Sequence, residues 1–551
     1  MEANTATEKD GEKKRGTMDM RHAFPWLICL IPLVFAVYCC MIKSGYYLDE
    51  YYSYGFSNST KGVTLLEVFD GNLVHQVITP DDLLDYITVG EGEAFDYSHI
   101  FDNCAQDMTP PLYYCILHTF CSFFPGVFTK WSGLSVNLIA FFVILLGLYH
   151  TSILLYRSRW VSALVVLCYG FSMGALNNVT YIRMYEFLTM LSVLLTYAVL
   201  KYIKEDKVRF SIFSGILIYL GFLTQYNFVF YAFFLCAAAC AVLLFKRKIK
   251  SCIIFASGAF AGVLAFLLTW PTFFLQLERD LGSKNEAGIA AGPLLFLFIF
   301  VILLCSEVGT ELCVLAVTMV LIAALKLILK KHRSEQERAA ENNKCMAEYL
   351  AVLTAFILGS LSIVYFSPFL LSRYCYITLP FFSVLIGLPF LVLRNNAADF
   401  ISKKGLKLNV NWLGVLLSVG IVIGAMQFER MSYLFLDNPE KLVVTDAVAK
   451  YPCLFFNTNY AKSITAATDH LVRFKDFYVV DGTSKEEYYA YLQNHENNEA
   501  VVVFVDTDPV VSSGLDAYEV INSLMAEGLY DSVVELYSVD SSSTFLLFNQ
   551  E

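Results

Sequence analysis

Long apolar runs recur along this chain between residues 23 and 427, and they limit its fold more than any other feature. A helix needs about 20 apolar residues to cross the hydrocarbon core of a bilayer. Hydrophobic residues make up 57% of the chain and charged residues 16%, as expected if many helices face lipid. Eleven runs have spanning length: 23–42, 132–155, 160–176, 186–200, 210–223, 228–245, 252–274, 312–329, 349–366, 376–393 and 412–427. The sequence therefore predicts a polytopic α-helical membrane protein with about eleven transmembrane helices within 23–427.

Three apolar runs need separate treatment. The run 23–42 follows a basic tail, but it is longer than the apolar region of a signal peptide and lacks a small-residue cleavage site, so we expect a retained first span. The stretches 111–125 and 293–306 are shorter, and the second runs into Glu307 and Glu311. We expect both short stretches to form partial or surface-lying helices.

The basic residues predict the topology, because short loops rich in Lys and Arg mark the cytoplasmic side. The basic clusters lie in the N-terminal tail and at 157–159, 201–209, 246–250, 326–338 and 394–407. Eleven spans place every cluster on one face of the membrane. If 111–125 and 293–306 also crossed, the clusters from 157 to 250 would move outside. We therefore expect 1–22 to be a cytoplasmic tail and the chain after residue 427 to lie outside.

The segment 428–551 has the pattern of a small α/β domain. Apolar β-type runs ("CLFFN", "DFYVV", "AVVVFVD", "STFLLFN") alternate with helical stretches such as "AYEVINSLMAEGL". The parity of the spans makes this domain extracytoplasmic. The domain organisation predicted is a tail at 1–22, a transmembrane unit at 23–427 with an external loop at 43–110, and the α/β domain at 428–551.

Charge and cysteine usage exclude some classes of protein. The net charge of −11 does not favour a nucleic-acid partner. The fifteen cysteines lie mostly within apolar runs and show no paired spacing, so they indicate neither a disulfide framework nor a zinc site. We interpret them as small buried apolar side chains.

Two adjacent carboxylates, Asp49 and Glu50, stand in "LDEYYSY", just after the first span. Charge so close to the bilayer is costly and points to a function, although a solvated helix flank is an equal alternative. Neighbouring side chains point to different faces of a helix or a strand, so the two carboxylates are not expected to reach the same atom.

A rigid corner follows in "DNCAQDMTPPLYY", where Asp107 stands three residues before Pro110. The fixed φ of proline and its effect on the preceding residue stiffen this corner. We expect it to hold Asp107 at the membrane surface near Asp49. The alternative is that the two prolines only begin a helix.

Two arginines stand at the outer ends of predicted spans, where positive-inside statistics do not explain them. Arg183 lies in "RMY" and Arg373 in "RYCYITLP". The guanidinium fork matches phosphate oxygens, so the pair predicts a site for an anionic lipid headgroup. Alternatively, Arg183 snorkels to the interface or pairs with Glu186. Tyr226, in the outer turn "LTQYNF", adds a hydrogen-bonding group.

The order of these motifs resembles the GT-C glycosyltransferases, specifically the family-39 type. That group includes the protein O-mannosyltransferases and the aminoarabinose transferases of lipid A. The resemblance covers about residues 25–395 and rests on "LDEYYSY", "D-x-x-PPLYY", "RMY" and "RYCYITLP". The sequence departs from the family at Lys130, where relatives often carry arginine, and at Tyr181, where many carry a carboxylate.

The resemblance implies an inverting glycosyltransferase. Such an enzyme moves a sugar from a polyprenyl-phosphate donor to a hydroxyl of a lipid, protein or cell-wall polymer on the outer face. It makes Asp49 the catalytic base, with Glu50 structural or positioning the acceptor and Asp107 orienting the acceptor or the sugar. The remaining assignments are Arg183, Tyr185 and Arg373 as ligands of the donor phosphate, and Tyr226 and Tyr374 as substrate contacts.

The sequence leaves two questions open. Some GT-C enzymes use a divalent ion, whereas the protein mannosyltransferases do not; this sequence shows no tight cluster of metal ligands. The alternative functions are a transporter or flippase of lipid-linked sugars, and a non-catalytic sensor with the external domain as receptor. A transporter needs charged or broken helices at the bilayer midplane. We find no charge in the middle of the eleven predicted spans.

Overall fold

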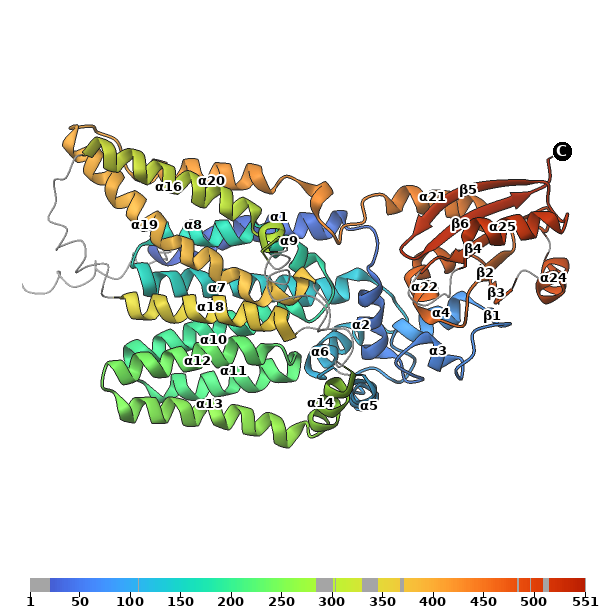
Figure 1. The fold of residues 1–551 in the computed structure, drawn as a ribbon, viewed down its shortest axis with the longest axis horizontal. Helices are drawn as coiled ribbons and strands as arrows, with labels where there is room; N and C mark the ends of the chain where they lie inside the picture. Colours follow the sequence, from blue (N-terminus) through green and yellow to red (C-terminus); the bar gives the residue numbers. More distant parts are fainter. Residues whose placement is uncertain are drawn as a thin grey trace, which may run out of the picture.

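The structure is a computed structural model. It describes residues 20–107, 109–283, 301–302, 304–329, 345–366, 371–482, 485–495, 497–508 and 515–550. A bundle of long helices forms one end of the molecule and a mixed sheet forms the other, with short helices of the first loop between them (Figure 1). This arrangement confirms the predicted fold class, a helical membrane unit with a small α/β unit at the C-terminal end of the chain.

Eight helices among the described residues are long and apolar enough to cross a membrane, so the protein is a multi-pass membrane protein. They are α1 (Met20–Ile42), α7 (Lys130–Tyr156), α10 (Tyr185–Glu205), α12 (Phe228–Phe245), α13 (Ile249–Thr269), α16 (Gly309–Leu329), α18 (Met346–Phe366) and α19 (Leu379–Lys403), the last continuous with η2 (Ser372–Thr378).

The predicted count of eleven spans is too high by this measure. The run 160–176 divides into α8 (Arg159–Gly170) and α9 (Met173–Thr180), which are bent by 58° and count as a ninth span at most. Ser172 causes the break, because its side chain accepts a hydrogen bond from Ala175 N and starts a new helix.

Two further predicted spans form helices that are too short for the same test. They are α11 (Val208–Thr224) and α20 (Asn411–Ala425), of 17 and 15 residues. Both nevertheless lie in the bundle, where α11 packs against α10 and α13, and α20 packs against α8 (Figure 1). All eleven predicted runs are thus helical, but hydropathy alone did not show where three of them stop.

The structure tests the prediction of a partial helix for only one of the two shorter stretches. The stretch 111–125 forms α6 (Leu112–Cys121), a ten-residue helix that is too short to span. Most of 293–306 lies outside the described residues, so the prediction of a partial helix there stays a prediction.

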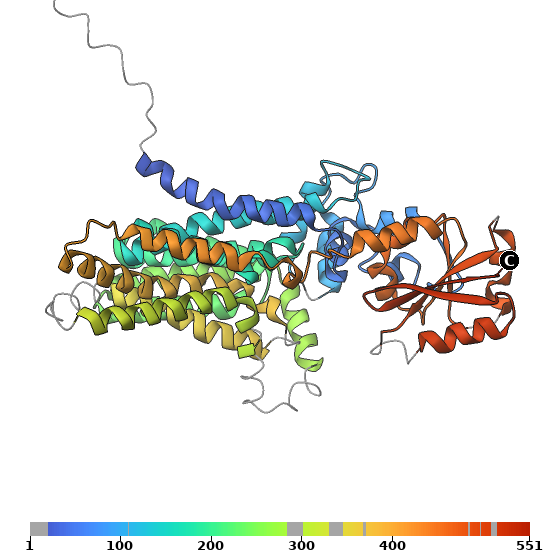
Figure 2. The ribbon, with the colours of Figure 1, turned by 90° about the horizontal axis from the view of Figure 1, so that it is seen from above.

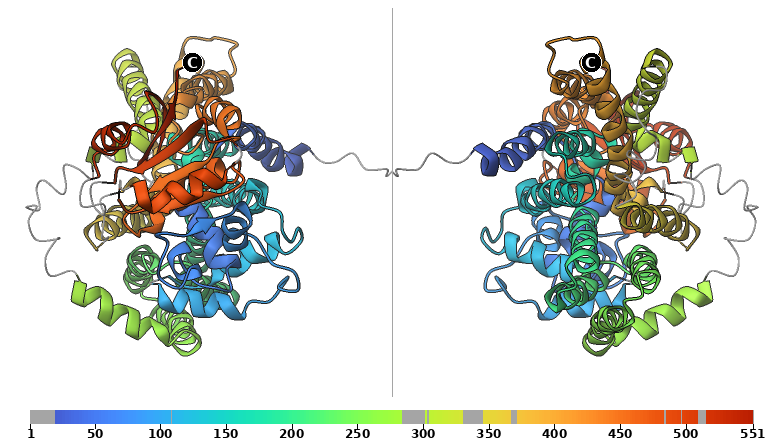
Figure 3. Two further views of the ribbon diagram at one scale, coloured as in Figure 1. Left: turned by 90° about the vertical axis from the view of Figure 1, so that its right-hand side faces the viewer. Right: turned by 90° about the vertical axis from the view of Figure 1, so that its left-hand side faces the viewer.

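The first loop folds into short helices against the end of the bundle. These are α2 (Leu48–Asn58), α3 (Leu65–Val68), α4 (Pro80–Ile87) and α5 (Ser98–Gln106), and they are joined there by α14 (Thr272–Ser283). The end-on views show the loop helices and the C-terminal unit at the same end of the bundle (Figure 3).

The C-terminal sheet has the strand order β1-β3-β2-β4-β6-β5. Its strands are β1 (Val77–Ile78), β2 (Cys453–Phe456), β3 (Phe477–Val480), β4 (Ala500–Asp506), β5 (Ser532–Val539) and β6 (Ser542–Phe548). Its helices are η3 (Phe428–Arg430), α21 (Asn438–Val448), α22 (Ala461–Ala466), α23 (Thr468–Leu471), α24 (Lys485–Asn494) and α25 (Ala517–Ala526). The strands β2, β3 and β4 are parallel, and β6 runs antiparallel to β4.

The four apolar β-type runs named from the sequence are all strands, and "AYEVINSLMAEGL" contains α25. Two strands, β1 and β5, were not predicted from the sequence. The strand β5 alternates weakly and exposes half of its side chains. The strand β1 comes from the first loop and pairs with β3 through the register Val77↔Tyr478.

The first loop and the C-terminal unit are therefore joined, and the join lies close to the end of α1. Ser44 N donates to Leu434 O, and the Lys43 ammonium donates to Tyr433 O at 2.7 Å. One continuous apolar core runs from the helical bundle into the sheet. Figure 2 shows the same contact from above, with the C-terminal unit resting on the loop helices.

Candidate active site

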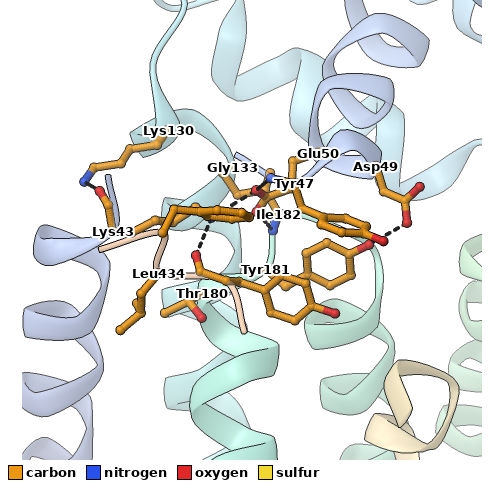
Figure 4. A network of polar contacts seen from close by, with 12 residues as sticks. Lys43, Tyr47, Asp49, Glu50, Lys130, Gly133, Thr180, Tyr181, Ile182 and Leu434 are labelled. Atoms are coloured by element: carbon orange, nitrogen blue, oxygen red, sulfur yellow. Dashed lines mark hydrogen bonds and ion pairs between the residues drawn. The ribbon is translucent and has the colours of Figure 1, made fainter. Parts of the chain in front are cut away.

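Asp49 and Arg373 meet at the end of the bundle that faces the C-terminal unit. One carboxylate oxygen of Asp49, Oδ2, lies 2.7 Å from Arg373 Nη1. The same oxygen accepts a hydrogen bond of 2.7 Å from the Tyr181 hydroxyl (Figure 4). Arg373 Nη1 also donates to the Tyr181 oxygen at 3.1 Å. The side chains of Arg373 and Asp49 are 14% and 20% exposed, so the pair is shielded from water but still reachable.

The break between α8 and α9 brings Tyr181 to this place. After α9 the chain is extended at Tyr181, and Asn137 of α7 donates to Tyr181 O at 2.7 Å. Gly133 allows the loop to approach α7 closely, because a Cβ there would lie 2.1 Å from a methyl group of Ile182. The loop that precedes α10 is thus held by the backbone and by α7.

Arg183 reaches the same helix, α2, by a different route. Its Nη1 donates to the backbone carbonyl of Asp49 at 3.2 Å and lies 3.4 Å from Ser53 Oγ. The suggested alternative, a pair with Glu186, is not seen, since both carboxylate oxygens of Glu186 are buried without a hydrogen-bond partner among the described residues. Arg183 therefore stands beside the Asp49 main chain, and Arg373 binds the Asp49 carboxylate.

Several hydrogen-bond donors around the two arginines lack partners. The Nε atoms of Arg183 and Arg373 are buried and unbonded within the described part of the chain, as are the hydroxyls of Tyr113 and Tyr114 at the start of α6. Burial raises the pKa of both phenols, and the nearby charge of Arg183 opposes that rise. Because buried donors are normally paired, this cluster has the character of an anion site.

The protonation state of Asp49 follows from its neighbours. Burial raises its pKa, but the charges of Arg183 and Arg373 and the hydrogen bond from Tyr181 outweigh burial, so the net pKa lies below the usual value. Asp49 is thus an ionised carboxylate at neutral pH and can accept a proton.

Glu50 points the other way and binds the scaffold. It accepts hydrogen bonds of 2.7 Å from the backbone N–H groups of Tyr47 and Ile182, and it forms an ion pair of 3.0 Å with Lys43. Both side chains of the ion pair are fully buried. Burial raises the pKa of Glu50, while Lys43 and the two N–H groups act to lower it. Glu50 thereby joins the end of α1, the start of α2 and the loop before Arg183 (Figure 4).

Asp107 and Tyr226 belong to a neighbouring corner. Asp107 caps the C-terminal end of α5, and its carbonyl accepts a hydrogen bond from Gln276 of α14. The Tyr226 hydroxyl bonds the amide oxygen of the same Gln276 and accepts a hydrogen bond of 2.8 Å from Trp270. Tyr226 thus contacts Gln276 of α14, which in turn bonds the carbonyl of Asp107 at the proline corner.

Tyr185 and Tyr374 lie on the arginine side of the site. Their rings pack edge to face with centroids 6.1 Å apart, and the Arg373 guanidinium lies 6.0 Å from the Tyr374 ring. The Tyr181 ring is stacked on Tyr433 at 4.0 Å and more loosely on Tyr185 at 6.0 Å. These rings form an aromatic wall around the guanidinium of Arg373.

Sequence reasoning missed two residues of the site. Tyr181 was noted only as a departure from the family pattern, yet its hydroxyl bonds both Asp49 and Arg373. Tyr433 comes from the linker after α20 and had no signal in the sequence. The other departure, Lys130, lies outside the site, because its ammonium donates to the carbonyls of Met41 and Lys43 at the end of α1.

Metal ligands form no cluster in the part of the chain that the structure describes, where no three His, Cys, Asp or Glu side chains lie together. The Asp49 oxygen that faces the site is bound by two hydrogen-bond donors, Arg373 and the Tyr181 hydroxyl.

Comparison with known proteins gives matches only at the level of structure. No protein-family model matches the sequence. No curated protein matches it either. A solved structure of ArnT from Cupriavidus metallidurans bound to undecaprenyl phosphate aligns over 95% of this chain and 98% of its own, with 13% identity and a TM-score of 0.48. The Archaeoglobus fulgidus oligosaccharyltransferase in complex with zinc and sulfate aligns over 92% of this chain and 71% of its own, with 10% identity and a TM-score of 0.43. Identities and scores this low leave the function to be decided by the side chains of the site.

Proposed function

We propose that this protein is an inverting glycosyltransferase that moves a sugar from a polyprenyl-phosphate donor to a hydroxyl acceptor at the outer face of the membrane. The observation that carries the proposal is the Asp49 carboxylate, held ionised by Arg373 and Tyr181 beside a second arginine with spare donors. A base and an anion site side by side are what transfer from a phosphate ester to a hydroxyl requires. The resemblance of the motifs to the family-39 glycosyltransferases supports the same function.

The donor phosphate is assigned to the two arginines. Each has a buried Nε without a partner among the described residues, and guanidinium groups bind phosphate oxygens through two parallel N–H bonds. The hydroxyls of Tyr113 and Tyr114 add unbonded donors on the α6 side. The prenyl chain then lies along the apolar helices of the bundle.

Chemistry proceeds in one displacement. The acceptor hydroxyl gives its proton to Asp49 while its oxygen attacks the anomeric carbon, opposite to the bond that links the sugar to the phosphate. That bond breaks, its electron pair goes to the phosphate oxygen, and the configuration at the anomeric carbon inverts. Arg183 and Arg373 stabilise the developing charge on the polyprenyl phosphate, so no separate general acid is needed.

In this scheme Arg373 interacts with two anions, the Asp49 carboxylate and the donor phosphate. In the structure its Nη1 binds Asp49, which keeps the carboxylate ionised but makes it a weaker base. A donor phosphate that attracts the guanidinium weakens its hold on Asp49, whose pKa then rises. Donor binding therefore prepares the base for the acceptor proton.

The direct test is release of free polyprenyl phosphate from a synthetic polyprenyl-phosphate sugar by the purified protein in lipid vesicles. We expect release that depends on an added hydroxyl acceptor and is lost in Asp49→Asn. A matched control is Asp85→Asn, which removes an exposed carboxylate of the same loop. Equal release by Asp49→Asn and the unmodified protein would exclude Asp49 as the base and with it this proposal.

Measurements on the same vesicles distinguish the proposed glycosyltransferase from the alternative, a transporter or flippase. The bend between α8 and α9 is a broken helix of the kind that transporters use. Its observed effect, however, is to direct Tyr181 and Arg183 to Asp49 at the end of the bundle. A flippase would move an intact labelled lipid-linked sugar between leaflets without breaking the sugar–phosphate bond, whereas we expect cleavage.

A further inference from the structure

A cavity of about 260 Å³ lies at the end of the bundle opposite to Asp49. It forms where α7 ends and α18 begins, and α19 passes both. Figure 1 shows these helix ends at the side of the molecule away from the C-terminal sheet. Polar lining groups include Arg157, Ser158, Tyr349, Arg394 and Asn395. The cavity is therefore separate from the site described above and lies at the other membrane surface.

The charge of the cavity is positive. Arg157 and Arg394 both line it, and among the described residues its lining contains no Asp or Glu. Within the described residues neither arginine takes part in an ion pair, and the Nε of Arg394 is buried without a hydrogen-bond partner. At the rim, the Lys204 ammonium lies 3.6 Å from Cys345 Sγ, adding a third cation. A buried Arg394 Nε without a partner, beside a second and exposed arginine, fits an anion.

An apolar groove adjoins the cavity at Arg394. It is a smaller hollow of about 20 Å³ between α8, α19 and α20. Its lining is mostly apolar and includes Trp160, Leu164, Phe390, Leu393 and Leu413, and Arg394 also lines it. The same residue, Arg394, thus borders a polar cavity and an apolar groove. A free anion would use the first feature only, whereas a lipid with a charged headgroup and an acyl chain uses both.

We propose that this cavity binds the phosphate headgroup of an anionic phospholipid, with Arg157 and Arg394 on the phosphate and an acyl chain lying along the apolar side chains beside α20. Basic pockets between helices at a membrane surface recognise such headgroups. The guanidinium groups fit phosphate oxygens in a way that a single ammonium does not. The Lys204 ammonium at the rim adds electrostatic attraction for the phosphate, and this contribution does not require a specific hydrogen-bond geometry.

Native mass spectrometry of the full chain in detergent tests the proposal, with phosphatidylglycerol as the anionic probe and phosphatidylcholine as the neutral probe. We expect the unmodified protein to retain phosphatidylglycerol preferentially. The double variant Arg157→Gln, Arg394→Gln should lose that preference by about thirtyfold, which corresponds to about 2 kcal/mol for the two cations removed from a lipid surface. The matched control is Arg247→Gln, Lys250→Gln, which removes two exposed charges and should leave the preference unchanged.

Three outcomes would overturn the proposal. They are equal retention of the two lipids by the unmodified protein, an unchanged preference in the cavity variant, and displacement of phosphatidylglycerol by inorganic phosphate at millimolar concentration. The last result would mark the site as one for a free phosphate.

A second measurement does not depend on how the variants fold. Photoreactive phosphatidylglycerol in vesicles should label peptides of α19 or α20 in the unmodified protein, and labelling found only on other helices would contradict the site.

Discussion

Lys43 and Glu50 form an ion pair of 3.0 Å with both side chains entirely buried, one residue away from the Asp49 carboxylate that binds Arg373. The two neighbouring acids thus have different tasks. Glu50 fastens α2 to α1 and to the loop at Ile182, and Asp49 is left to face the site. The geometry makes separate predictions for the two residues.

The first prediction concerns stability. Glu50→Gln leaves the Lys43 ammonium buried without its counter-charge, and breaking a buried pair in this way costs about 3–5 kcal/mol. We expect a large loss of thermal stability or of folded protein. The double change Lys43→Met, Glu50→Gln should recover much of the loss, and thermal unfolding of the unmodified protein and the two variants in one detergent measures this. Three equal midpoints would contradict the structural role.

The second prediction concerns chemistry. Asp49→Asn keeps the shape of the side chain but removes the proton acceptor, so turnover should fall by roughly 10²–10⁴ while the donor still binds. Asp49→Glu should also be poor, because the extra methylene displaces the carboxylate from the acceptor. Turnover and donor binding are to be measured on the same folded preparation. An active Asp49→Asn together with a folded but inactive Glu50→Gln would reverse the two assignments.

The third prediction concerns the donor phosphate. Arg183→Ala should reduce transition-state stabilisation by about 2–4 kcal/mol, and Arg183→Lys should lose part of it, because lysine keeps the charge but not the planar fork. The readout is kcat/KM for the donor, compared with Arg209→Ala, a mostly exposed arginine elsewhere on the chain, as control. Near-normal kcat/KM in Arg183→Ala would assign the phosphate to Arg373.

The fourth prediction concerns pH. Arg373 lowers the pKa of Asp49, so Arg373→Gln should move the acid limb of the kcat/KM profile to higher pH. The linked stability has the same origin. Because the folded pKa lies below the unfolded value of about 3.9, ionised Asp49 stabilises the fold above that pH, and this contribution is lost as the pH falls through the folded pKa. An acid limb at the same pH in both proteins would show that another group titrates.

The fifth prediction concerns topology. The one-sided basic clusters predict that the N-terminus lies in the cytoplasm and the C-terminal unit outside. A reporter fused after Lys250 should give a cytoplasmic signal, and one fused after Glu551 an external signal. A cytoplasmic signal at Glu551 would place the C-terminal unit, and the Asp49 site beside it, on the inner face.

Much of the candidate site could be predicted from the sequence because its residues belong to short local motifs. The position of Asp49 and Glu50 at the end of a span, and of Arg183 and Arg373 at the ends of others, can be read from charge and hydropathy. Their pairing cannot, since Asp49 and Arg373 are more than 300 residues apart in the chain. Only the folded structure shows that Arg373 binds the carboxylate and that Arg183 binds the main chain.

The sequence by itself determined the apolar helices, four strands of the C-terminal sheet and the position of the acidic and arginine motifs at helix ends, because each depends on a periodicity or a charge within about 20 residues. Tertiary structure decided the remainder. The approach of Ile182 to Gly133 and the addition of β1 to a strand about 400 residues away arise from packing between distant segments. Local patterns carry no record of such contacts, and it is these contacts that set which of two adjacent carboxylates faces the arginines.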